Sequence, residues 1–115
     1  MDLDEAIGKH IEWKTTLRSA IAKQASVDTA TIRSDSCCDL GIWLHGEGAA
    51  RHRGKAGFIR VLDTHAEFHR RAGEVADTIN AKNYELAETM LDARSDFGAA
   101  SIAVAAAILG LLKET

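Results

Sequence analysis

The sequence contains no proline and only two cysteines among its 115 residues, and aromatic residues make up 5% of it. A collagen-like chain needs abundant proline and a small disulfide-bonded scaffold needs many cysteines, so both classes are excluded. Hydrophobic residues make up 46% of the sequence, which a disordered chain does not reach. What is left is a globular protein, and the length predicts one domain over residues 1–115.

The sequence also lacks a large excess of charge of one sign: the formal net charge is −3, and the 14 lysines and arginines are spread along the chain. Without a basic stripe, binding of nucleic acid is not expected. The first residues, M-D-L-D-E, are acidic where a secretory signal is positively charged. The longest apolar stretch, residues 98–112, is shorter than the ~20 residues that span a bilayer, so no membrane insertion is predicted.

The two cysteines, Cys37 and Cys38, are neighbours in the sequence. Adjacent cysteines suit neither an ordinary structural disulfide nor a C-x-x-C redox pair. Reduced thiols are the rule in the cytoplasm, which is therefore the predicted compartment.

Apolar residues recur at helical spacing over most of the chain, and no segment alternates with the two-residue period of a strand. Asp2 or Asp4 is expected to cap the first helix and Asn83 the last. The pattern predicts a short helix near Cys38, over residues 38–44, and three long helices, over residues 3–25, 58–82 and 83–113. Two segments rich in small polar residues or glycine are predicted to be loops, residues 26–36 and 45–57.

The expected architecture is an all-α four-helix bundle in which one helix is short or broken. Small side chains on the last helix allow close approach of another helix: Ala99, Ala100, Ala103 and Ala107. That helix belongs either to the same chain or to a second copy, because small helical units often complete their core by symmetric pairing. A homodimer is therefore expected.

His65 and His69 are four residues apart, so a helix places both imidazoles on one face, within reach of a shared metal ion. The pair alone is weak evidence, because two half-buried or surface histidines give the same pattern. Glu67 lies between them, but the segment is not the H-E-x-x-H motif of zinc proteases. A residue two positions along a helix points about 200° away from the first.

Cys38 begins the short predicted helix, and a helix N-terminus favours the thiolate form that binds zinc. His10 lies on the apolar face of the first helix, near Ile7 and Ile11, and is a fourth candidate ligand. Each has an ordinary alternative, because a lone cysteine is often a small buried residue and a histidine on an apolar face often belongs to the core.

Three segments resemble motifs of one known family. Residues 38–44, C-D-L-G-I-W-L, resemble the C-x-[LF]-G-x-W-[LY] signature of the chemoreceptor zinc-binding (CZB) domain, found in bacterial chemoreceptors and diguanylate cyclases. Residues 9–14, K-H-I-E-W-K, resemble its H-x-x-W-K segment, and residues 65–69, H-A-E-F-H, its H-x-x-F-H segment. The motifs occur in the family's order, and the family's final helix is expected to cover the rest of the chain.

The resemblance implies a zinc site inside the bundle with four ligands: His10, Cys38, His65 and His69. Three histidines and a cysteine fill the tetrahedral shell of zinc and leave no position for a catalytic water, so the protein is not expected to be an enzyme. A thiolate among imidazoles also suits zinc better than magnesium or calcium. Three other candidates are expected not to bind the ion: Cys37, a packing residue or spare thiol, and the solvated His45 and His52.

Residues near the four ligands are expected to support the site. Gly41 is interpreted as a small residue that lets the Cys38 helix approach another backbone. Trp13 and Trp43 are interpreted as large packing residues that shield the site. Ligand histidines usually hand their other N–H to an acceptor, and three residues are alternatives for a role in this second layer: Trp13, Asp39 and Glu67.

The resemblance implies a regulatory sensor of zinc, or of an oxidant such as hypochlorous acid that reacts with zinc-bound Cys38. Family members signal to chemotaxis or to cyclic di-GMP synthesis, so an output domain or partner protein is expected. Two alternatives stay open. A hemerythrin-like di-iron bundle needs bridging carboxylates and about five histidines. A purely structural zinc domain would show no conformational response to zinc or oxidant.

Overall fold

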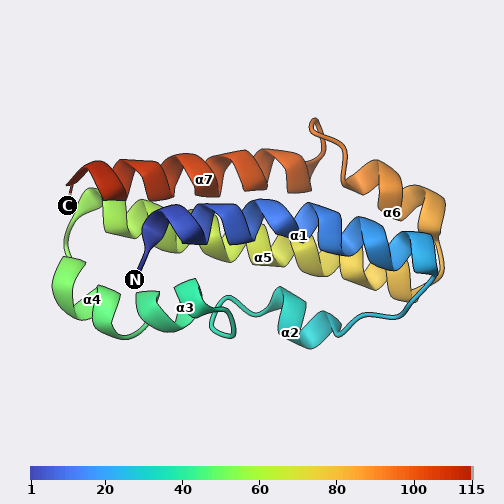
Figure 1. Ribbon diagram of the computed structural model, residues 1–115, viewed down its shortest axis with the longest axis horizontal. Coiled ribbons are helices and arrows are strands. Elements are labelled where there is room, and N and C mark those ends of the chain that lie inside the picture. The colour runs from blue at the N-terminus through green and yellow to red at the C-terminus, as the bar shows by residue number, and fades with distance from the viewer. Residues whose placement is uncertain (115) are drawn as a thin grey trace.

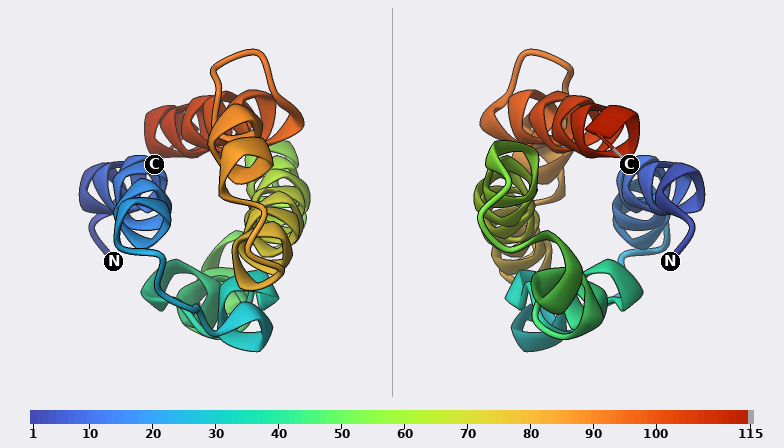
Figure 2. Two further views of the ribbon diagram at one scale, coloured as in Figure 1. Left: turned by 90° about the vertical axis from the view of Figure 1, so that its right-hand side faces the viewer. Right: turned by 90° about the vertical axis from the view of Figure 1, so that its left-hand side faces the viewer.

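The computed structural model describes residues 1–114. Over these residues the chain forms helices and no strand, so the all-helical prediction is confirmed. Three long helices run along the 42 Å length of the bundle (Figure 1): α1, Leu3–Lys23; α5, Ala56–Asn80; and α7, Asp96–Glu114. Viewed from the end, the fourth side of the bundle is closed by a series of short helices (Figure 2): α2, Thr29–Arg33; α3, Asp39–Leu44; and α4, Glu47–His52.

The core lies between the long helices. Helix α5 makes its most extensive contacts with α7 and then with α2, and α1 also packs against α7. Several large apolar side chains are removed from water almost completely: Leu17, Val61, Phe68, Val75, Ile79, Val104, Ile108 and Leu111. Each such side chain stabilises the fold by about 1.5–3 kcal/mol relative to an exposed one, so these contacts fix where α5 and α1 lie.

The segment 26–36, which the sequence predicts to be a loop, contains α2. The carboxylate of Asp28 accepts hydrogen bonds from the backbone N–H and the hydroxyl of Thr31, at 3.3 and 2.7 Å. Ile32 anchors this helix in the core. The loop prediction is wrong here because the small polar residues that form turns also cap helices.

The glycine-rich segment 45–57 is also not a simple loop, because it contains α4. Gly48 is buried, and a Cβ at this position would lie 2.7 Å from the Trp43 ring. Glycine therefore allows α4 to pack directly on Trp43. Gly54 has φ of +92°, a backbone conformation that favours glycine, and α5 starts two residues later.

The helix predicted over residues 83–113 is divided into α6, Tyr84–Met90, and α7. The side chain of Asn83 caps α6, as predicted. The hydroxyl of Ser95 accepts a hydrogen bond from the N–H of Gly98 at 3.0 Å, which starts α7. A Cβ on Gly98 would lie 2.5 Å from the carbonyl oxygen of Asp92, so the chain turns back tightly here. Apolar periodicity alone does not reveal such a break.

Among the described residues, α7 is the one helix long and apolar enough to cross a membrane. It has 19 residues, more than the apolar run in the sequence indicates. Its inner face packs against α5 and α1, as a core helix of a bundle does. Its outer face carries the exposed Ile102 and Leu109.

Candidate metal centre

The four candidate ligands lie together inside the bundle. His10 comes from α1, His65 and His69 from successive turns of α5, and Cys38 from the residue that precedes α3. One nitrogen or sulfur atom of each lies within 4.8 Å of the others. The three histidines are at most 4% exposed and the cysteine is half-buried. The fold therefore brings together residues up to 59 positions apart in the sequence.

The spacing of the side chains suits a tetrahedral ion. The sulfur of Cys38 lies 3.2 Å from Nε2 of His65 and 3.6 Å from Nε2 of His69. Zinc bond lengths near 2.3 Å to sulfur and 2.0–2.1 Å to nitrogen, at a tetrahedral angle, place the two ligand atoms about 3.6 Å apart. The cluster includes no carboxylate, so it does not provide the bridging ligands of a di-iron centre.

Two of the histidines are oriented by backbone carbonyl groups. The Nδ1–H of His10 donates to the carbonyl of Ala6 at 2.7 Å, and the Nδ1–H of His69 donates to the carbonyl of Ile32 at 2.8 Å. These bonds leave Nε2 of each ring with a free lone pair for a metal ion. The sequence suggested Trp13, Asp39 and Glu67 as neighbours that orient the ligand histidines. The acceptors are backbone carbonyl groups, which no sequence pattern identifies.

Two buried ring nitrogens have no hydrogen-bond partner among the described residues: His10 Nε2 and His65 Nδ1. A buried polar atom without a partner costs about 1–3 kcal/mol, so such atoms are rare unless something else binds them. A metal ion bound to His10 Nε2 would satisfy that atom. The residues present therefore fit a metal ion.

Burial keeps the three histidines neutral. It lowers the pKa of His65 to about 3, with the neighbouring His69 and His10 adding to the effect. Burial also lowers the pKa of His10 and of His69, although the carbonyl groups that they contact oppose the change. Neutral imidazole is the form that binds a metal, so the histidines need no deprotonation near pH 7.

Cys38 occupies the predicted position at the start of a helix. Its sulfur accepts a hydrogen bond from the N–H of Gly41 at 3.3 Å and thereby caps α3. The net effect on its acidity is the reverse of the expected one. Burial raises the pKa of the Cys38 thiol, and the backbone N–H groups of Gly41 and Leu40 oppose this only in part. A cation would therefore be needed to stabilise the thiolate at neutral pH.

Gly41 has the structural role that the sequence suggests. A Cβ at this position would lie 1.9 Å from the carbonyl oxygen of Asp35, which no L-residue other than glycine can accommodate without a backbone shift. The close contact folds residues 35–38 back onto α3. It thereby fixes the place of Cys38 relative to α5.

The two tryptophans differ in what they contact. The ring of Trp13 lies 6.4 Å from that of His69, beside the cluster. Trp43 instead packs over Gly48 and lies 5.6 Å from the ring of His52, so it joins α3 to α4. His52 is consequently half-buried and not solvated as expected, whereas His45 is exposed as expected.

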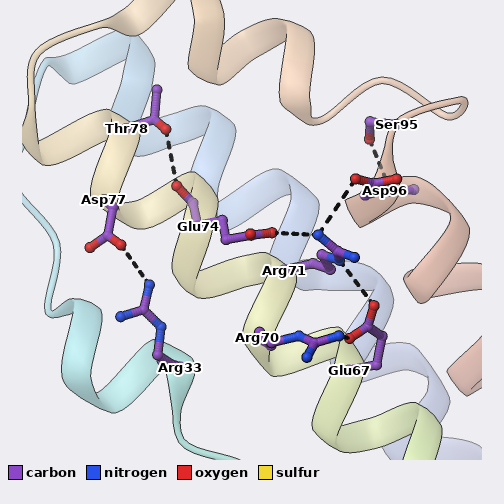
Figure 3. Close-up of polar contacts among 10 residues, drawn as sticks. Arg33, Glu67, Arg70, Arg71, Glu74, Asp77, Thr78, Ser95 and Asp96 are labelled. Atoms are coloured by element: carbon purple, nitrogen blue, oxygen red, sulfur yellow. Dashed lines mark hydrogen bonds and ion pairs between the residues drawn. The ribbon is translucent and has the colours of Figure 1, made fainter.

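Asp39 and Glu67 do not take the roles expected beside the ligand histidines. Asp39 is exposed and accepts a hydrogen bond from Lys9 at 3.1 Å. The carboxylate of Glu67 forms ion pairs with Arg70 and Arg71 on the outer face of α5 (Figure 3). Glu67 lies away from the ligand histidines because a helix rotates by about 200° over two residues, so Glu67 is not on the face that carries His65.

The residues around Glu67 join three helices at the surface. Arg71 also contacts Glu74 at 3.0 Å and Asp96, the first residue of α7, at 3.5 Å (Figure 3). Arg33 of α2 contacts Asp77 of α5 at 2.5 Å. Ion pairs at the surface contribute about 0–1 kcal/mol each, so these contacts add little to the stability of the bundle.

An all-helical bundle with three histidines and a cysteine converging in its interior is a metal-binding bundle. The chain belongs to the chemoreceptor zinc-binding domain family, CZB, whose model matches residues 10–76. The match begins at His10 and includes all four residues of the cluster, while α6 and α7 lie outside it. No curated protein and no solved structure matches the chain significantly.

Proposed function

We propose that the protein is a regulatory sensor module that holds one Zn²⁺ through His10, Cys38, His65 and His69. The supporting observation is the convergence of these four residues, with His10 Nε2 buried and without a partner. Bound zinc would supply positive charge that stabilises the Cys38 thiolate and would join α1, α3 and α5. With four protein ligands the shell is closed, which favours regulation over catalysis.

The metal content of the purified protein tests this function. Protein purified without added metal is expected to contain about one zinc per chain, and Cys38→Ser is expected to contain less. Cys37→Ser is the matched control, because Cys37 is exposed and outside the cluster. Zinc that stays unchanged when both His65 and His69 are replaced by alanine contradicts the proposal. Iron in place of zinc would favour a di-iron protein.

The proposed signal is a change at Cys38, caused by zinc occupancy or by oxidation. Hypochlorous acid converts a thiolate to sulfenic acid and chloride, a two-electron oxidation of the sulfur. Sulfenic acid is neutral and a weaker zinc ligand than thiolate. Because Cys38 also caps α3, its oxidation would release the start of that short helix while His10 and His69 retain their carbonyl contacts. Chemotaxis or cyclic di-GMP synthesis is the proposed output, in the bacterial cytoplasm.

A homodimer is the proposed assembly, acting on an output domain or partner protein. The outer face of α7 supports it, because exposed small and apolar residues follow one another at helical spacing: Ala99, Ile102, Ala103, Ala106 and Leu109. Ile102 is 66% exposed. Sedimentation at micromolar concentration is expected to show a dimer, and Ile102→Glu is expected to give a monomer. A zinc-loaded wild-type monomer contradicts the proposed assembly.

A further inference from the structure

A cavity of about 580 Å³ opens between residues 1–16 and the segment Cys37–Leu40. Both His10 and Cys38 line it, so it reaches two members of the cluster. The unpartnered Nε2 of His10 belongs to one of these lining residues. The cavity therefore adjoins the cluster and is not a separate site.

Acidic residues outnumber lysine and arginine around this cavity. One lysine, Lys9, and four carboxylates line it: Asp2, Glu5, Glu12 and Asp39. Asp2 is also the cap of α1, and its side chain accepts a hydrogen bond from the N–H of Glu5 at 3.1 Å. Acidic groups at a mouth raise the local concentration of cations and their rate of arrival.

Lys9 crosses the cavity between its two walls. Its ammonium group lies 3.1 Å from the carboxylate of Asp39, at the start of α3, and 3.7 Å from that of Glu5, on its own helix. The contact with Asp39 joins α1 directly to the residue that follows Cys38.

We propose that this cavity is the path by which a divalent cation reaches and leaves the cluster, with Glu12 at the mouth attracting the cation and the Lys9–Asp39 ion pair restraining it. The inference rests on the proposed function for the identity of the cation. The proposed route does not rest on that function, because the same cavity determines how a solute reaches Cys38 in the metal-free protein. The two parts are therefore tested separately.

The first test measures access to Cys38 in metal-free protein that carries Cys37→Ser. The probes are two methanethiosulfonate reagents, one with a trimethylammonium group and one with a sulfonate group. The Cys38 thiolate attacks the reagent, a disulfide forms and methanesulfinate leaves. The cationic probe is expected to react faster. At low salt Glu12→Gln is expected to slow the cationic probe and to speed the anionic probe, each about two- to three-fold, the factor for one unit charge several ångströms away in water. The ratio of the two rates is then expected to fall about four- to nine-fold.

Two controls accompany this test: a variant that removes one carboxylate far from the cavity, and a high salt concentration. Glu85→Gln alters an exposed carboxylate on α6, at the opposite end of the bundle from residue 1 (Figure 1), and is expected to leave the ratio unchanged. About 1 M salt is expected to abolish the effect of Glu12→Gln, because the screening length is then about 3 Å. An equal ratio in wild type, Glu12→Gln and Glu85→Gln overturns the entry path.

The second test measures transfer of zinc from loaded protein to an excess of chelator. Lys9→Gln is expected to increase the rate of release about two- to five-fold, the factor that corresponds to an exposed ion pair. Lys23→Gln removes a lysine from the last turn of the same helix and is expected to have no effect. Equal release from the two variants overturns the role of Lys9. A wild-type protein that binds no zinc contradicts the proposed function, while the thiol-probe result still decides the path.

Discussion

The imidazole of His69 donates its Nδ1–H to the backbone carbonyl of Ile32, 2.8 Å away on a different helix. This bond fixes the ring with Nε2 directed at the cluster, 3.6 Å from the sulfur of Cys38. Its length depends on how closely α2 packs against α5. The short helix α2 is thus part of the candidate metal centre although it contributes no ligand.

Gly73 controls that packing. It lies one turn after His69, and a Cβ there would be 2.8 Å from Cβ of Arg33, which follows Ile32. Gly73→Ala is therefore expected to push α2 outward, to lengthen the His69–Ile32 bond and to weaken zinc binding about 10–100-fold. Competition with a chelator measures the affinity. Gly110→Ala, in open space on α7, is the control, and equal affinities for the two variants refute the link.

Gly41→Ala is expected to destabilise the metal-free fold by about 1–3 kcal/mol, because its Cβ would overlap the backbone of Asp35. Gly8→Ala is a matched control in the interior of α1, where no atom lies within 4 Å of the new Cβ. It is expected to stabilise the protein by about 0.5–1 kcal/mol, since alanine loses less entropy in a helix. Urea unfolding measures both. Effects of the same sign would show that the Asp35 contact is relaxed in solution.

Acid is expected to destabilise the metal-free protein from about pH 6.5 downward. An unfolded histidine titrates near pH 6.5, whereas burial lowers the pKa of all three cluster histidines and that of His65 to about 3. The unfolded state therefore binds more protons below pH 6.5, and the free energy of unfolding falls by up to about 1.4 kcal/mol per pH unit for each histidine. Above about pH 7 these groups add no pH dependence.

His65→Gln isolates the contribution of one histidine. Between pH 4 and 6 its free energy of unfolding, measured with urea and a chelator, is expected to fall less steeply than that of the wild type by about 1.4 kcal/mol per pH unit. Carboxylates titrate in both proteins and cancel in the difference. Parallel slopes would mean that His65 is protonated equally in the folded and unfolded states.

Zinc is expected to reverse the order in which the two cysteines are oxidised. In metal-free protein Cys38 is half-buried with a raised pKa, so the exposed Cys37 reacts first with substoichiometric hypochlorous acid. In zinc-loaded protein Cys38 is a thiolate and reacts first. Mass spectrometry identifies the modified residue, and amide exchange is expected to rise over residues 36–46. Oxidation of Cys38 without a change in exchange would favour a purely structural zinc domain.

Part of the candidate site was predictable from local relationships in the sequence, and the resemblance to the CZB family implied the full set of four ligands. Four residues along a helix always bring His65 and His69 to one face. The sequence also predicted Cys38 at the start of a short helix, where its sulfur accepts a hydrogen bond from the N–H of Gly41. The same rotation of the helix excluded Glu67 from the H-E-x-x-H motif, and it also explains why Glu67 pairs with Arg71 and not with a ligand histidine. The apolar periodicity was likewise sufficient to predict the long helices α1 and α5.

Only the tertiary structure decided what surrounds those ligands, because backbone groups and burial leave no mark in the sequence. The carbonyl of Ile32 is an acceptor for His69 only because α2 packs on α5, and nothing in the residue type reveals it. The raised pKa of Cys38 follows from its burial among side chains distant in the sequence, which outweighs the helix N-terminus. The break near Ser95 likewise results from a tight turn, which needs glycine at position 98 because a Cβ there would meet backbone carbonyl groups. This turn divides an apolar pattern that the sequence alone presents as one helix.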